Sequence, residues 1–180
     1  KFGMLATLLL ASFFFYGFWY PPYLILLTFS ILVNFSVSLI VDKFRFEALG
    51  RAAFLAGVLL NISLLAFFKY TAFILDNLSE INWVEPREVN ILLPLAISFF
   101  TFQQIGYLTE VFRSKPAERN IVQYALFVSF FPQLIAGPIV QHRHVSHQFE
   151  NIDKIKSRLW LASNGLCLFA IGLSKKLLLA

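Results

Sequence analysis

The chain has 180 residues, of which 58% are hydrophobic and only 14% charged, with a formal net charge of +5. A soluble domain carries about 25% charged residues. The composition therefore excludes a disordered chain, a nucleic-acid-binding domain and an ordinary cytosolic enzyme. It predicts a protein of the lipid bilayer, in which Lys and Arg mark the loops that stay cytoplasmic.

Apolar segments follow one another along the whole chain, and a helix needs about 20 such residues to cross the hydrocarbon core. We expect segments at residues 2–20, 23–41, 52–75, 91–112, 121–140 and 159–173, the last being short for a crossing. The first is too long and too aromatic for a secretory signal. Pro21 and Pro22 cannot continue a helix and predict a tight turn after it. This pattern predicts an all-α, multi-pass membrane protein.

The two ends of the chain suggest a piece of a larger protein. The sequence begins with Lys1 and stops within an apolar run at residues 177–180. We therefore expect residues 1–180 to form one incomplete membrane domain. The single Cys167 lies inside an apolar segment, and with no second cysteine it forms no intrachain disulfide.

Loop charges predict an orientation and then contradict a simple count of crossings. The 42–51 loop is basic and the 76–90 loop acidic, so the first is expected in the cytoplasm and the second outside. The basic 113–119 loop then falls in the cytoplasm as expected. If residues 121–140 crossed, however, the basic 141–158 stretch would lie outside.

Segment 121–140 is therefore expected to be broken or re-entrant rather than to cross. Pro132 and the Gly137-Pro138 pair interrupt its second half. Such a break is tolerated at membrane depth only where protein or a water-filled cavity covers the freed backbone. We accordingly expect residues 130–140 to lie near an interior cavity.

Polar side chains recur along segment 91–112. Thr101, Gln104, Tyr107 and Glu110 stand at every third position, and Gln103 falls on the same half of a helix. Two interpretations are open: these groups join helices by hydrogen bonds, or they line a polar substrate channel. Lys69 has a similar pair of interpretations, snorkelling to the interface or an intramembrane ion pair.

Three histidines, His142, His144 and His147, follow the Gly-Pro pair. No carboxylate or cysteine pattern completes a zinc site around them, so we expect no metal there. They predict a polar interfacial loop in which one histidine touches an incoming ligand. The sequence has no G-x-S-x-G, H-E-x-x-H or phosphate-binding glycine loop, so no nucleophile–base pair can be assembled from it.

Two stretches resemble a known family. Residues 93–107, LPLAISFFTFQQIGY, are similar to the L-P-x-G-I-S-F-x-T-F-Q motif of membrane-bound O-acyltransferases. Residues 129–140, SFFPQLIAGPIV, are similar to the F-P-x-x-x-x-G-P-I block of its bacterial branch that includes alginate O-acetyltransferases. Residues 67–70 and 172–176 match more loosely. Ala96 stands where the family often has Gly, a change expected to matter little.

The resemblance implies a transferase with a funnel through the membrane. An acyl donor such as acetyl-CoA, with no bound cofactor, would enter from the cytoplasm, and an extracytoplasmic partner would pass the acyl group to a polysaccharide. The protein would lie in the bacterial inner membrane. The family's catalytic histidine motif has no match here, so the C-terminal catalytic half is expected to be missing and the fragment inactive. Candidate channel residues are Ser98, Thr101, Gln103, Gln104, Tyr107, Gln133, Gly137, Pro138 and His142.

Two other classes of protein compete with the acyltransferase. Broken helices near the membrane midplane are also typical of transporters and channels. Against a transporter, the two halves of the chain hold no corresponding pair of interrupted segments, and no intramembrane acid is placed for ion coupling. Glu110 is the nearest candidate and lies at the cytoplasmic end of its segment. A purely structural membrane scaffold is the third possibility.

Overall fold

The computed structural model describes residues 2–80, 92–113, 115–137, 142–150 and 158–179. This part of the chain is entirely helical and loop, with no β-strand, which confirms the predicted all-α class. Its helices are α1 (Phe2–Trp19), α2 (Pro21–Lys43), α3 (Ala48–Glu80), α4 (Ile97–Phe112), α5 (Ile121–Ser129), α6 (Phe131–Ala136), α7 (His142–Glu150) and α8 (Arg158–Leu179).

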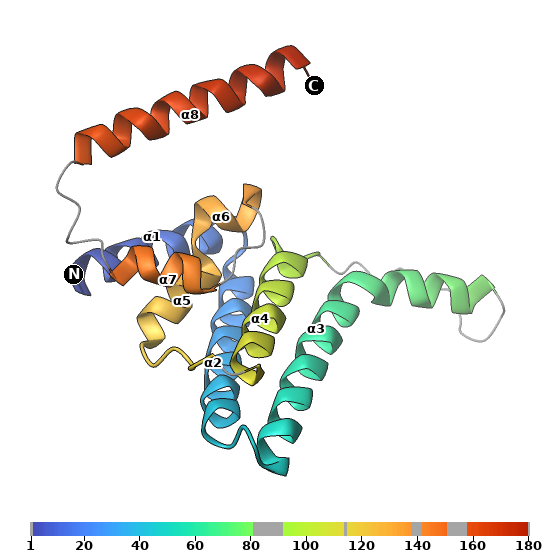
Figure 1. The fold of residues 1–180 in the computed structure, drawn as a ribbon. Helices are drawn as coiled ribbons and strands as arrows, with labels where there is room; N and C mark the ends of the chain where they lie inside the picture. Colours follow the sequence, from blue (N-terminus) through green and yellow to red (C-terminus); the bar gives the residue numbers. More distant parts are fainter. Residues whose placement is uncertain (1, 81–91, 114, 138–141, 151–157, 180) are drawn as a thin grey trace.

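Helices α2, α3 and α4 run side by side as one bundle (Figure 1). Gly57 of α3 allows close approach, because a Cβ there would lie 2.9 Å from both Leu108 of α4 and Val37 of α2. Phe54 and Phe112 stack with ring centroids 4.4 Å apart where α3 begins and α4 ends. The last part of α3 turns away from the bundle (Figure 1).

A second group of helices packs on the side of α2. Helix α1 lies against α5 and α6, and α7 lies against α5 (Figure 1). Ring contacts join them: Phe15 to Phe131 at 5.3 Å, and Phe130 to Phe149 at 6.0 Å. The core cluster spans both groups and includes Tyr124 and Phe127 of α5 beside Ile31 of α2.

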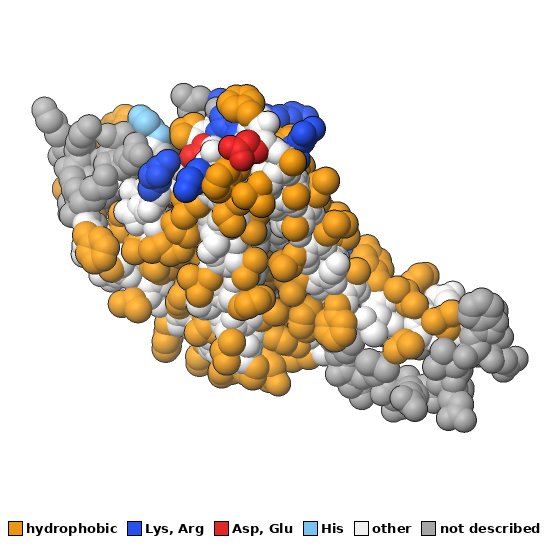
Figure 2. Space-filling model, turned by 90° about the horizontal axis from the view of Figure 1, so that it is seen from below, with side chains coloured by type: hydrophobic (Ala, Val, Ile, Leu, Met, Phe, Trp, Pro, Cys, Tyr) orange, Lys and Arg blue, Asp and Glu red, His pale blue; other side chains and the backbone are white. Residues whose placement is uncertain are grey.

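Among the described residues, four helical stretches are long and apolar enough to cross a membrane: Phe2–Trp19, Pro21–Lys43, Ala48–Thr71 and Leu159–Leu178. The chain is therefore a multi-pass membrane protein. Figure 2 shows hydrophobic side chains over most of one face, with the charged side chains gathered at one edge. This separation is typical of a bundle whose sides face lipid and whose end faces water.

Several predicted boundaries are wrong. Helix α8 has 22 residues and continues through Lys175 and Lys176, so it is not too short to cross; long basic side chains reach the interface from a helix end. Pro21 and Pro22 form the first turn of α2, where no backbone N–H is needed, and not a separate turn. Helix α3 continues past Leu75 to Glu80, into the predicted loop.

Segment 91–112 also differs from its prediction. Its helix begins only at Ile97 and has 16 residues, about 24 Å at 1.5 Å per residue, and it is not among the four candidate spans. The non-helical backbone before it is held by tyrosines. The Tyr16 hydroxyl donates to the Leu95 carbonyl at 3.1 Å, and the Tyr23 hydroxyl donates to the Leu92 carbonyl.

Ala96 ends this non-helical stretch in a left-handed conformation, with φ 55° and ψ 25°. No other non-glycine residue in the described ranges has positive φ. A residue with a Cβ adopts this conformation at a free-energy cost of about 1–2 kcal/mol, because the Cβ lies too close to the following carbonyl oxygen. This backbone is one that glycine suits best, which argues against the expectation that Ala in place of Gly matters little.

The predicted break in segment 121–140 is confirmed. Helix α5 ends at Ser129, and α6 begins at Phe131 with Pro132 in its first turn. Phe130 between them has an extended ψ of 105°. With nine and six residues, α5 and α6 are each too short to cross a bilayer.

Candidate functional site

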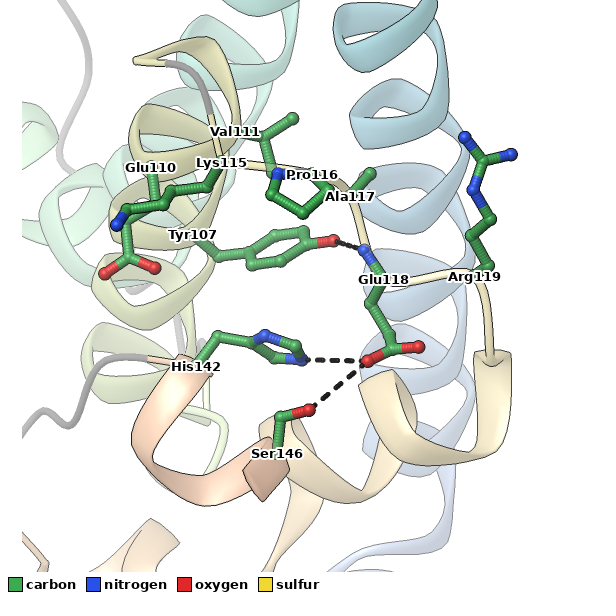
Figure 3. A pocket seen from close by; sticks show the side chains of 10 residues that line it. All are labelled: Tyr107, Glu110, Val111, Lys115, Pro116, Ala117, Glu118, Arg119, His142 and Ser146. Carbon is green, nitrogen blue, oxygen red and sulfur yellow. Dashed lines mark hydrogen bonds and ion pairs between the residues drawn. The ribbon is translucent and has the colours of Figure 1, made fainter. Parts of the chain in front are cut away.

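A cavity of about 490 Å³ lies where the loop after α4 meets α7 (Figure 3). It is lined by Tyr107, Glu110, Val111, Lys115, Pro116, Ala117, Glu118, Arg119, His142 and Ser146. The lining residues come from three separate parts of the chain: the end of α4, the loop to α5, and α7. The fold therefore gathers two carboxylates, an imidazole, a phenol and two cations around one cavity.

Glu118 is the centre of this arrangement (Figure 3). Its Oε2 lies 3.7 Å from His142 Nε2 and accepts a hydrogen bond from Ser146 Oγ at 3.5 Å. Its Oε1 accepts from the backbone N–H of Asn120 at 2.8 Å. Because the side chains of Glu118 and His142 are only 13% and 12% exposed, this interaction is poorly screened by water.

Hydrogen bonds fix the loop that carries Glu118 to α4 and to the start of α5. The backbone N–H of Glu118 donates to the Tyr107 hydroxyl of α4 at 2.8 Å, and that hydroxyl donates to Ser38 Oγ of α2 at 3.4 Å. Asn120 then caps α5, its Oδ1 accepting from the N–H groups of Val122 and Gln123. Capping of this kind satisfies N–H groups that a helix leaves unpaired at its start.

Aromatic rings hold the imidazole of His142. Its ring centroid lies 5.0 Å from that of Tyr107 and 4.8 Å from that of Phe127, the latter in an edge-on arrangement. Tyr107 also packs against Tyr124 at 4.9 Å. The imidazole therefore has a carboxylate at one nitrogen and aromatic faces around it, which restricts its orientation.

The 113–120 loop is tied to the α2–α3 turn. Arg45 Nη2 donates to Asp42 Oδ1 at 2.7 Å and to the Lys115 carbonyl at 2.8 Å. Asp42 Oδ2 is also 3.5 Å from the guanidinium of Arg119. These contacts place the two basic loops at one end of the bundle, as the predicted orientation requires.

The contact between Glu118 and His142 brings together residues on either side of the broken segment. Glu118 precedes α5 and His142 begins α7, and both line the cavity. The predicted failure of this segment to cross is therefore supported. The polar stretch after it begins as the helix α7 rather than as the loop that we expected.

Some of the predicted channel residues line the cavity, and others form hydrogen bonds between helices. Tyr107 and His142 line the cavity. Gln103 donates to the Phe127 carbonyl at 3.0 Å, and Gln104 donates to Ser30 Oγ at 3.1 Å, so these two join helices. Thr101 is fully buried. For the glutamines, the observed contacts are those of the interhelical interpretation.

The remaining candidates lie elsewhere. Ser98 borders a smaller cavity of about 350 Å³ at the start of α4, which Leu134 of α6 also lines. Gln133 lies in α6, and Gly137 ends that helix with its N–H donating to the Gln133 carbonyl. Pro138 lies outside the described residues, as does the side chain of His144. His147 is exposed.

The sequence-based interpretation missed Glu118, Ser146, Lys115 and Arg119 as cavity residues. The 113–119 loop served there only as a marker of orientation. The spacing of His142 and Ser146, four residues apart, would have placed both on one helical face. Among the described residues no group of three or more His, Cys, Asp or Glu side chains could hold a metal ion.

The fold and the cavity define a class: a multi-pass helical membrane protein with a polar site at the end of its bundle. No family model matches the chain, and no solved structure matches it. Named relatives do. A peptidoglycan O-acetyltransferase of Helicobacter pylori is 40% identical over 96% of this chain and 38% of the relative.

Further relatives are named as probable alginate O-acetylases AlgI. That of Pseudomonas aeruginosa is 35% identical and that of Pseudomonas syringae 33% identical, each over 96% of this chain and 34% of the relative. The chain thus spans little more than a third of the length of the curated relatives it matches. These similarities confirm the resemblance to membrane-bound O-acyltransferases that the two motifs predict.

Proposed function

We propose that the chain is part of a membrane O-acetyltransferase that acetylates hydroxyl groups of a cell-envelope polysaccharide. The observation that carries the proposal is the similarity, over 96% of the chain, to proteins named for O-acetylation of peptidoglycan and alginate. The proposed location is the bacterial inner membrane, where a multi-pass protein has access to both compartments.

The donor proposed for this reaction is acetyl-CoA, entering from the side of the basic loops. The 490 Å³ cavity opens among these loops, and the exposed cations Lys115 and Arg119 stand at its border. A phosphate-bearing donor is attracted by such cations. Deeper in the cavity, the Tyr107 hydroxyl and the His142 imidazole offer hydrogen bonds to the polar part of the donor.

Acyl transfer to a hydroxyl needs a base for the hydroxyl proton and donors for the oxyanion. The family's catalytic histidine motif has no match among these 180 residues. We therefore propose that they form the donor side of the site, and that on their own they transfer no acetyl groups. Incorporation of labelled acetate by the purified 180-residue chain would contradict this.

The acceptor side is proposed to involve an extracytoplasmic protein that hands the acetyl group to the polysaccharide. The competing proposal of a transporter or channel is weaker, because the relatives reported above are named for acetyl transfer and not for transport.

The test is deletion of the gene that encodes this chain. Ester-linked acetate released from envelope polysaccharide by mild alkali should fall in the deletion strain and return with the wild-type gene. His142→Gln should restore it only in part, whereas His147→Gln, which changes an exposed histidine of the same helix, should restore it fully. Unchanged acetate in the deletion strain would refute the proposal.

A further inference from the structure

The α2–α3 turn carries an exposed group of three cations and one aromatic ring. Lys43 is the last residue of α2, Phe46 lies in the turn, and Arg51 lies in the first turns of α3. Arg113 follows α4 directly. All four side chains are exposed, Phe46 by 92%. We call these four residues the turn patch.

The helix packing brings Arg113 to the same end as the other members. Phe54 of α3 stacks on Phe112 of α4, and Arg51 lies one turn from Phe54 while Arg113 adjoins Phe112. The Lys43 ammonium lies 5.1 Å from the ring centroid of Phe44. Lys and Arg side chains also gather at one edge of the face in Figure 2.

The acids near the turn patch leave its cations largely uncompensated. Asp42 is occupied by Arg45 at 2.7 Å and by Arg119 at 3.5 Å. Glu47 is exposed in the same turn. Within the described ranges, no ion pair involves Lys43, Arg51 or Arg113. Glu110 is partly buried three residues before Arg113, so three exposed cations lie near one exposed and one partly buried carboxylate.

The turn patch lies where two candidate membrane spans meet, the depth at which a span reaches the membrane–water boundary. Two candidate spans, Pro21–Lys43 and Ala48–Thr71, end on either side of the turn. Phosphates of lipid headgroups occupy that depth, and the acyl region begins directly below it. A ring that is 92% exposed to water gains free energy by entering the apolar boundary, and basic side chains beside it gain from anionic headgroups.

We infer that the turn patch binds anionic phospholipid, with Lys43, Arg51 and Arg113 on headgroup phosphates and Phe46 inserted at the acyl boundary. The inference does not depend on the proposed function. Each cation near an anionic membrane surface contributes about a fivefold gain in affinity. The three together predict about a hundredfold preference for anionic over zwitterionic lipid.

The test is native mass spectrometry of the full-length protein in detergent with added phosphatidylglycerol or phosphatidylcholine. Wild type should retain phosphatidylglycerol at much lower lipid concentration. K43Q/R51Q/R113Q should lose this preference, while K43R/R51K/R113K, which keeps the charges, should retain it. F46S should weaken binding of both lipids. Lys69→Gln, which removes a cation from α3 far from the turn patch, is the matched control and should change nothing.

Three results would overturn the inference. Equal retention of both lipids by wild type would show that the protein has no preference for anionic lipid. Undiminished retention of phosphatidylglycerol by the folded K43Q/R51Q/R113Q variant would show that these three cations do not bind it. Competition by millimolar inorganic phosphate as effective as that by phosphatidylglycerol would assign the cations to a soluble anion instead. Helical circular dichroism of each variant shows that it is folded.

Discussion

Glu118 Oε2 lies 3.7 Å from His142 Nε2, and the broken segment α5–α6 lies between these two residues in the sequence. Both residues line the polar cavity. Two structural consequences follow, one for stability and one for topology.

Removal of the Glu118 carboxylate should destabilise the fold. Glu118→Ala removes the carboxylate beside the largely buried His142, the acceptor of Ser146 Oγ and the acceptor of the Asn120 N–H. Loss of such partners is expected to lower the free energy of unfolding by about 2 kcal/mol. Thermal unfolding in detergent micelles should show a drop of several degrees.

Two variants sharpen this measurement. Glu118→Gln keeps an acceptor for Asn120 and Ser146 and should recover part of the loss. Glu47→Ala removes an exposed carboxylate from the neighbouring turn and should have little effect. Equal effects of the Glu47 and Glu118 changes would show that the cavity contacts contribute nothing to stability.

The same contact predicts the topology around segment 121–140. With Cys167 replaced by Ala, single cysteines at Lys43, Arg119 and His147 should react with an impermeant maleimide from the same side of the membrane. All three positions are exposed. A cysteine at Asn77, at the far end of α3, should react from the opposite side. Labelling of positions 119 and 147 from opposite sides would mean that segment 121–140 crosses.

The broken segment was predictable because its signals are local. Pro132 cannot sit inside a helix, and the charges that follow it contradict a crossing. The polar positions of α4 were predictable for the same reason, since Gln103 and Gln104 need partners inside a bilayer. Their partners, the Phe127 carbonyl and Ser30, come from tertiary packing and could not be read from the sequence.

The cavity and the left-handed Ala96 could not be predicted. Glu118 meets His142 only because α5 and α6 fold back, which no local pattern specifies. Ala is a good helix former, so nothing in its identity indicates a positive φ at Ala96.

Ala96→Gly should therefore stabilise the protein. Glycine adopts φ 55° without the Cβ clash, and the expected gain is about 1 kcal/mol after its larger loss of chain entropy. Thermal unfolding should move upward by a few degrees. Ala53→Gly, the same change inside α3, should lower stability by about 1 kcal/mol. If both changes had the same sign, the left-handed backbone at Ala96 would be in error.

Asn34 and Asn61 should prove to be coupled inside the bundle. Asn61 Nδ2 donates to Asn34 Oδ1 at 2.6 Å, and Asn34 Nδ2 donates back to Asn61 Oδ1 at 3.3 Å, with both side chains fully buried between α2 and α3. A double-mutant cycle with N34A and N61A should give a coupling free energy of about 1 kcal/mol, near the upper part of the range for side-chain hydrogen bonds between membrane helices. Each single variant should lose most of what the double variant loses, because either change removes both hydrogen bonds of the pair and leaves the other amide only its bond to a carbonyl of its own helix, Ser30 for Asn34 and Gly57 for Asn61. Strict additivity of the two single effects would show that the pair does not join α2 to α3.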